Sequence, residues 1–314
     1  MDANSNVLLL PLCFFGLYMI LEAADWGLCI SAPAVSRNQE ENKAILNALN
    51  PALDGNELWY LLGMFMMGAA IPGISANEGR GEGMVLIGLV LSGALFRMIA
   101  VLMKNVVSKP AVMKFMSFFS VIVLAGISLT GTSLLMPDGS YFSLLGIVSA
   151  LWVILASFQI GTLYGAMKVV NPLGERFRAA FLVSSVLNVI VYIILAILLK
   201  NHAGESNIYG NFFWISLVAT AILFVVAFFF TRMRHVKTGL AAAYLSSFFA
   251  IAVYLSCYAA ILPDIFPVEV GSVKQALDTM PSTALLALAV VWSLGSFVWR
   301  LIRKKINYEW DDHI

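Results

Sequence analysis

The feature that most constrains this chain is a series of nine long apolar stretches separated by short polar loops. Each stretch approaches or exceeds the roughly 20 apolar residues that a helix needs to cross the hydrocarbon core of a bilayer. Because a helix satisfies its own backbone hydrogen bonds in lipid, we expect nine transmembrane helices. The expected bounds are residues 7–30, 58–76, 83–103, 115–135, 142–167, 179–200, 211–232, 239–262 and 283–301.

The composition is that of an integral membrane protein. The chain is 61% hydrophobic and only 12% charged, whereas a soluble domain has about 25% charged residues. No soluble domain or low-complexity linker interrupts the stretches, so residues 1–314 are expected to form a single integral membrane domain. The first stretch has no positive segment before it and is too long for a signal-peptide core, so we expect a retained span.

The positions of the cations predict the orientation. Fifteen of the nineteen Lys and Arg residues fall in the C-terminal tail and in the loops after the first, third, fifth and seventh stretches. Cytoplasmic loops of membrane proteins are enriched in Lys and Arg, so the N-terminus is expected outside and the C-terminus in the cytoplasm. The expected fold is all-α, with two four-helix bundles plus a C-terminal helix.

Three charged residues lie within the apolar stretches. Glu22 and Asp25 are three residues apart on the first stretch and therefore share one helix face. Arg97, on the third stretch, lies at a similar depth in the cytoplasmic third of the membrane. A charge in hydrocarbon costs at least ~2.5 kcal/mol, so it is normally paired, hydrated or functional.

Two hypotheses account for these charges. Arg97 could form an ion pair with Asp25 or Glu22 that merely docks the first helix against the third. Alternatively, the acids form a proton route with Asp54, at the cytoplasmic mouth of the second stretch, as its entrance. Two neighbouring carboxylates resist being ionised together, which leaves one able to hold an exchangeable proton. Two acids are more than one docking cation requires, and this favours the route.

The cytoplasmic loop 31–57 is expected to contain a short amphipathic helix lying at the membrane surface. Asn38 is placed to cap its start, with the Glu41 side chain reaching back, and Pro51 ends it. Trp59 and Tyr60 lie near a span end and suit the interfacial aromatic belt.

Other polar side chains in the stretches are expected to have structural roles. Gln159 and Asn188, on the fifth and sixth stretches, are expected to make interhelical hydrogen bonds. No metal-ligand spacing is present, and no histidine lies within an apolar stretch where it could ligate a buried haem.

The first hundred residues resemble subunit II of the cytochrome bd quinol oxidases. That family has an acidic pair three residues apart at the end of helix 1, followed by Gly, and a Trp-Asp-Gly-Asn-x-x-Trp motif at the start of helix 2. The corresponding segments here are Glu22-Ala23-Ala24-Asp25-Trp26-Gly27, Arg37-Asn38, Asn47-Ala48-Leu49-Asn50-Pro51, Leu53-Asp54-Gly55-Asn56-Glu57-Leu58-Trp59 and Phe96-Arg97.

The resemblance implies a subunit of a prokaryotic cytoplasmic membrane complex that has no catalytic residue and no haem or metal of its own. A homologous subunit I would carry haem b, and haem d in the usual case, oxidise quinol and reduce oxygen. By the motif match, Asp54 would be the proton entrance, with Asp25 and Glu22 further in and Gly55, Asn56 and Trp59 as supporting residues. A small single-helix subunit and a structural quinone or lipid are further expected partners, whereas nucleic acid is not.

The chain departs from the family pattern at three positions. Glu22 stands where Asp is usual, Leu53 where the motif has Trp, and Met98 where Pro is common. These departures leave open a bd-like complex with a different electron acceptor. A proton-coupled secondary transporter and a pure scaffold subunit are the rival hypotheses. The transporter has weak support, since Pro72, in the second expected span, lies toward its outer end rather than at the midplane.

Overall fold

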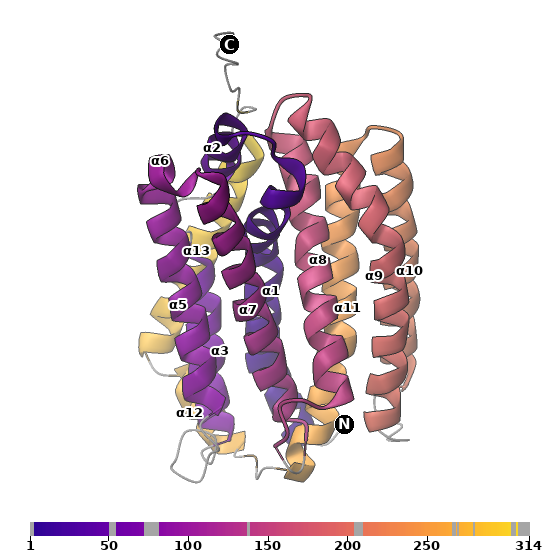
Figure 1. Ribbon diagram of the computed structural model, residues 1–314. Coiled ribbons are helices and arrows are strands. Elements are labelled where there is room, and N and C mark those ends of the chain that lie inside the picture. Colours follow the sequence, from indigo (N-terminus) through magenta and orange to yellow (C-terminus); the bar gives the residue numbers. More distant parts are fainter. Residues whose placement is uncertain are drawn as a thin grey trace, which may run out of the picture.

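The computed structural model describes residues 3–49, 55–71, 82–136, 139–203, 210–265, 268, 270–278, 280–302 and 306. Within these residues the secondary structure is helical apart from turns and one isolated parallel bridge between Val169 and Ile306. The helices stand side by side in one bundle (Figure 1). They are α1 (Ala3–Val35), α2 (Gln39–Ala48), α3 (Asn56–Ala70), α5 (Glu82–Leu102), α6 (Lys104–Val107), α7 (Pro110–Ser133), α8 (Leu144–Lys168), α9 (Leu173–Ala203), α10 (Gly210–Arg232), α11 (Val236–Ile265), α12 (Val270–Asp278) and α13 (Met280–Ile302).

The prediction of an all-helical membrane protein is confirmed. Each apolar stretch coincides with a helix, and α1, α7, α8, α9, α10 and α11 are long and apolar enough to cross a membrane. Large apolar side chains face outward, among them Val183 at 80%, Ile215 at 64% and Val291 at 71% exposure. Such a surface is compatible with lipid rather than water. The count of nine spans stays a prediction, because α3 has 15 described residues and part of its expected span, 72–76, lies outside the described residues.

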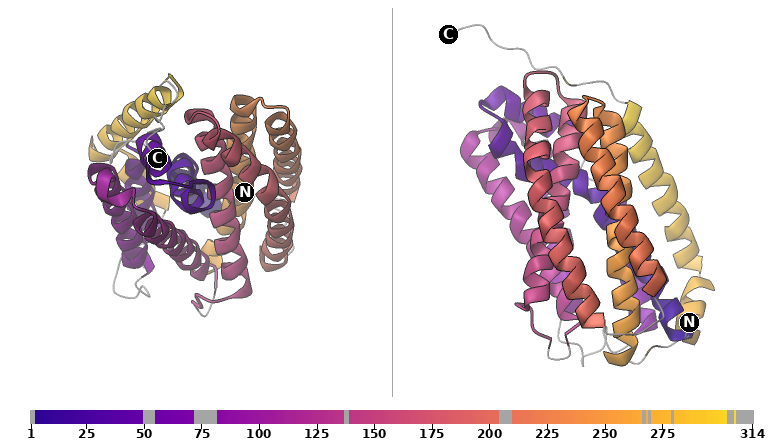
Figure 2. Two further views of the ribbon diagram at one scale, coloured as in Figure 1. Left: turned by 45° about the horizontal axis from the view of Figure 1, so that its top comes forward. Right: turned by 90° about the vertical axis from the view of Figure 1, so that its right-hand side faces the viewer.

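Helix α1 lies inside the bundle and joins its two halves (Figure 2). It packs against α3 and α7 on one side and against α8 and α11 on the other. Helices α8 to α11 pack closely among themselves, whereas α13 lies at the edge and packs chiefly against α3. The acidic residues of α1 are therefore at the centre of the molecule.

Two glycine contacts hold α1 in that position. At the crossing of α1 and α8, a Cβ on Gly27 would lie 1.8 Å from the backbone oxygen of Ser157. A Cβ on Gly161 would lie 2.1 Å from the carbonyl carbon of Gly27, so the two backbones touch. On α5, a Cβ on Gly93 would lie 2.4 Å from the indole ring of Trp26. Small residues allow this close approach of helices in membranes.

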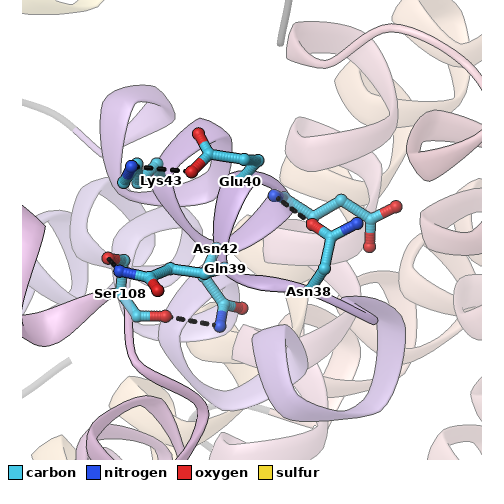
Figure 3. A network of polar contacts seen from close by, with 7 residues as sticks. Asn38, Gln39, Glu40, Asn42, Lys43 and Ser108 are labelled. Carbon is cyan, nitrogen blue, oxygen red and sulfur yellow. Dashed lines mark hydrogen bonds and ion pairs between the residues drawn. The ribbon is translucent and has the colours of Figure 1, made fainter. Parts of the chain in front are cut away.

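Helix α2 confirms the predicted capped helix in the 31–57 loop (Figure 3). The Asn38 side chain accepts a hydrogen bond from the Glu41 backbone N–H at 2.8 Å. Two further bonds fix α2 to the segment after α6: Asn42 Nδ2 donates to the Ser108 backbone oxygen at 2.7 Å, and Gln39 Nε2 donates to Ser108 Oγ at 3.1 Å.

The Glu41 side chain does reach back, and it does more than the sequence indicates. It accepts a hydrogen bond from the Arg37 backbone N–H at 2.6 Å and forms an ion pair with the Arg176 guanidinium of α9. Glu41 has no exposed surface. Helix α2 is thus partly inserted among the helix ends, and its buried residues include Asn42, Ile45 and Leu46.

Candidate functional site

Glu22 and Asp25 are both buried inside the bundle, as the sequence predicts. They lie one turn apart on α1, and each has 1% of its surface exposed. The adjacent Ala23 and Ala24 are also buried, so this turn of α1 is enclosed on all sides. Ionisable groups in such a place are costly unless they are paired or exchange protons.

A hydrogen bond joins Glu22 to the start of α3. Asn56 Nδ2 donates to Glu22 Oε1 at 3.0 Å, and Asn56 is itself 3% exposed. Gly55, which precedes α3, has a φ of +86°, a left-handed conformation that favours glycine. The bond therefore links Asn56, at the start of α3, directly to the buried Glu22 of α1.

The structure describes only part of the predicted site. Asp54 lies outside the described residues, and so does the side chain of Arg97. The predicted ion pair of Arg97 with Asp25 or Glu22 therefore stays a prediction. On the backbone, Arg97 lies one turn of α5 beyond Gly93, which contacts Trp26 next to Asp25.

Sequence reasoning missed the partner that Glu22 has in the structure. The sequence suggested an oppositely charged side chain as the partner of Glu22, whereas Glu22 accepts a hydrogen bond from the neutral carboxamide of Asn56. The sequence contained a signal, since Asn56 belongs to the quoted motif and begins an apolar helix. What the sequence could not supply was the register that brings residues 34 positions apart together.

The prediction for Trp59 and Tyr60 was wrong. Trp59 is 8% and Tyr60 4% exposed, so neither ring lies in a lipid-facing belt. The Trp59 indole N–H instead donates to Ser293 Oγ of α13 at 3.0 Å. Buried Trp and Tyr side chains usually need such a partner for their polar atom.

A cavity of about 340 Å³ adjoins the site on the side toward the N-terminal end of α1. Ala23 of α1 and Tyr60 of α3 are among its lining residues, which otherwise are mostly apolar. The Tyr60 hydroxyl is buried and has no hydrogen-bond partner among the described residues. The cavity could therefore hold an apolar molecule with one polar group near Tyr60.

The predicted polar contact between the fifth and sixth stretches is confirmed. Asn188 Nδ2 of α9 donates to Gln159 Oε1 of α8 at 2.5 Å, and both residues are buried. Among the described residues, no group of three or more His, Cys, Asp or Glu side chains could hold a metal ion.

The family described as "Cytochrome bd terminal oxidase subunit II" matches residues 5–302. The chain belongs to this family. It is similar to "Cytochrome bd ubiquinol oxidase subunit 2" of Bacillus subtilis (strain 168), with 22% identity over an alignment that covers 96% of each chain. Its fold matches a solved chain from "The structure of bd oxidase from Geobacillus thermodenitrificans", with a TM-score of 0.69, 14% identity and 96% coverage of both chains.

Membership makes this protein a subunit of a bd-type terminal oxidase and a multi-pass bacterial membrane protein. As a subunit II, it implies a subunit I as partner within an oxidoreductase complex. The resemblance that the first hundred residues indicated is thus confirmed over nearly the whole chain.

Proposed function

We propose that this subunit supplies the oxidase with protons from the cytoplasm through Asp54, Glu22 and Asp25. The observation that carries the proposal is the hydrogen bond from Asn56 to Glu22. Asp54 is two residues from Asn56, a chain distance of at most about 7 Å. A proton taken up at Asp54 would therefore have only a short distance to travel to the buried pair on α1.

The proposed route requires the cytoplasmic end of the bundle to be the end where α1 finishes and α3 begins. The cation distribution supports this orientation, with nine spans, the N-terminus outside and the C-terminus in the cytoplasm. The route would lead from the cytoplasmic surface to the partner subunit. There, haem b and haem d would receive electrons from quinol and use the protons to reduce oxygen.

This chain would provide no haem ligand and no catalytic residue. Its second proposed role is that of a scaffold for subunit I. Family membership favours an oxidase subunit over the proton-coupled transporter that the embedded charges alone would also suit. A small single-helix subunit, if present, would add to this scaffold.

We also propose that the cavity beside Tyr60 holds an isoprenoid quinone or a lipid tail as a structural filler. The lining of the cavity is mostly apolar, and the Tyr60 hydroxyl would donate to a carbonyl or ester oxygen of the occupant. Mass spectrometry of molecules extracted from the purified complex tests this. Tyr60→Phe should reduce the amount of the bound molecule, and an equal amount in wild type and variant would contradict the assignment.

The proton route is tested by neutralising each acid in the whole complex. Asp54→Asn, Asp25→Asn and Glu22→Gln should slow oxygen consumption while the reduced-minus-oxidised haem spectrum stays unchanged. Glu175→Gln is the matched control, because Glu175 lies on α9 outside the route and pairs with Arg178 at 2.6 Å. Turnover equal to that of the control in all three variants would rule out the route and leave the scaffold role.

A further inference from the structure

The final helix, α13, makes a polar contact with the first turn of α3. Ser293 Oγ accepts the hydrogen bond of the Trp59 indole N–H at 3.0 Å. The same hydroxyl donates to the Ala289 backbone oxygen one turn earlier at 2.5 Å, which fixes its direction. Ser293 is 4% exposed, so this contact is shielded from lipid and water. A buried hydrogen bond of this kind defines the register of two helices.

The preceding residue of α13, Trp292, covers the backbone at Gly55, just before α3. A Cβ on Gly55 would lie 2.7 Å from Cγ and 2.8 Å from Cβ of Trp292. Trp292 therefore packs directly on the left-handed backbone of Gly55, between Asp54 and Asn56 in sequence. Any larger residue at position 55 would push α13 away from α3.

α13 has few other neighbours that could explain its position. Among the described helices, it packs chiefly against α3 and, near its start, against α12. Ala289 enters the apolar cluster formed by α1 and α3, whereas Val291, Leu294 and Val298 are exposed. In Figure 2 the helix, drawn in yellow, stands at the edge of the bundle. Its buried surface thus lies mainly against α3, the helix that follows the proposed proton entrance in the sequence.

A second attachment lies beyond the end of α13. The Ile306 backbone N–H donates to the Lys168 backbone oxygen at 2.7 Å, at the end of α8. Ile306, which follows α13 in the sequence, is thus attached to the end of α8.

From these contacts we infer that α13 is a positioning element for Gly55 and Asn56 at the start of α3, with Ser293 and Trp292 as its positioning residues. Ser293 sets the rotation and depth of α3 through Trp59. Trp292 holds the backbone at Gly55, so that the next residue, Asn56, reaches Glu22. The inference rests on the proposed proton route, since it assigns to α13 the alignment of the entrance of that route.

The test compares variants of the assembled oxidase by oxygen consumption across a range of pH, with haem content measured in each. Ser293→Ala removes the acceptor for Trp59, and Trp292→Leu removes the ring over Gly55. Ser293→Thr keeps the hydroxyl, and Val291→Ala alters an exposed residue of the same helix. Turnover per haem should fall on the order of threefold to tenfold in Ser293→Ala, the effect of losing one buried hydrogen bond. It should also fall in Trp292→Leu, which loses the packing on Gly55.

The pH profile separates positioning from a general loss of structure. A slower proton uptake limits turnover first at high pH, where protons are scarce, so the loss should grow as pH rises. Ser293→Thr should restore the wild-type profile. A uniform loss at every pH, or a loss of haem in proportion to activity, would overturn the inference.

Two comparisons keep the test decisive. If Ser293→Ala does not assemble, Trp59→Phe removes the same hydrogen bond from the other side and should give the same profile. If Asp54→Asn slows turnover but the Ser293, Trp292 and Trp59 variants match Val291→Ala, the inference fails and the proton route stands. If Asp54→Asn, Asp25→Asn and Glu22→Gln all have normal turnover, the proton route fails as well.

Discussion

The crossing of α1 and α8 gives a prediction whose sign depends on the structure. In Gly27→Ala, the new Cβ would lie 1.8 Å from the Ser157 oxygen and 2.8 Å from the Gly161 Cα. Both are backbone atoms, so no side-chain rotation relieves the clash, and the helices must separate. Overpacking of this kind costs typically 1–3 kcal/mol, and a clash with backbone belongs at about the upper end.

The substitution also has a favourable term. Alanine is a better helix former than glycine by about 1 kcal/mol. The net expectation for Gly27→Ala is therefore a destabilisation of about 2 kcal/mol. Gly88 on α5 is the matched control, because a Cβ there meets nothing within 4 Å. Gly88→Ala should leave stability unchanged or raise it by up to about 1 kcal/mol.

The assay is thermal unfolding of the purified complex in detergent, followed by tryptophan fluorescence and haem absorbance. Gly27→Ala should melt below wild type and Gly88→Ala at or above it. Since Gly27 is two residues from Asp25, separation of the helices should also displace the acids and lower the turnover of Gly27→Ala at temperatures where it is still folded. Equal melting temperatures for the two variants would refute the close crossing of the backbones.

Three further predictions concern polar contacts. Asn56→Ala should lower the turnover measured by oxygen consumption roughly threefold to tenfold with haem content unchanged, because Glu22 loses a buried donor. Asn56→Gln should also lower turnover, because its longer side chain places the carboxamide differently against Glu22. Glu41→Gln should loosen α2, because it leaves the Arg176 guanidinium without its carboxylate. Limited proteolysis within residues 37–49 should then become faster. A rate equal to that of wild type would contradict the anchoring role. Gln159→Leu should destabilise the complex by about 0.6–1.7 kcal/mol, the range for other interhelical hydrogen bonds in membranes. The double variant Gln159→Leu, Asn188→Leu should recover part of this loss in the same melting assay, because both partners of the hydrogen bond are then removed.

The helices of this protein could be predicted well from sequence, because crossing a membrane requires an apolar stretch of a certain length, and that length can be read from the sequence. Even α2 was found, since the capping pattern from Asn38 to Glu41 is local. The burial of Glu22 and Asp25 also followed from their position in an apolar stretch. All of these features depend on residues close together in the chain.

The contacts between helices could not be predicted in the same way. In a membrane, the face of a helix toward lipid and the face toward its neighbours are both apolar, so the pattern does not tell which residues are buried. Trp59 illustrates this: its position near a span end suggested the lipid interface, but it donates to Ser293, 234 residues away. The pairing of Asn56 with Glu22 and the covering of Gly55 by Trp292 are of the same kind.

The chemistry of Asn56 bears on how the proposed proton route would work. An arginine beside Glu22 would favour the ionised carboxylate and hold it in that state. A carboxamide is neutral and has both donor and acceptor atoms. Its Nδ2 donates to Glu22 Oε1 in the arrangement observed, and its Oδ1 is an acceptor of the kind that a protonated Glu22 would need after a rotation of either side chain. A carboxyl group that relays protons must be stabilised both when protonated and when ionised, and the Asn56 carboxamide can hydrogen-bond to Glu22 in either state.

Asn56→Asp tests this argument, because a second carboxylate 3.0 Å away would favour one shared proton. The variant should therefore slow turnover, as Asn56→Ala does, although it keeps the size of the side chain.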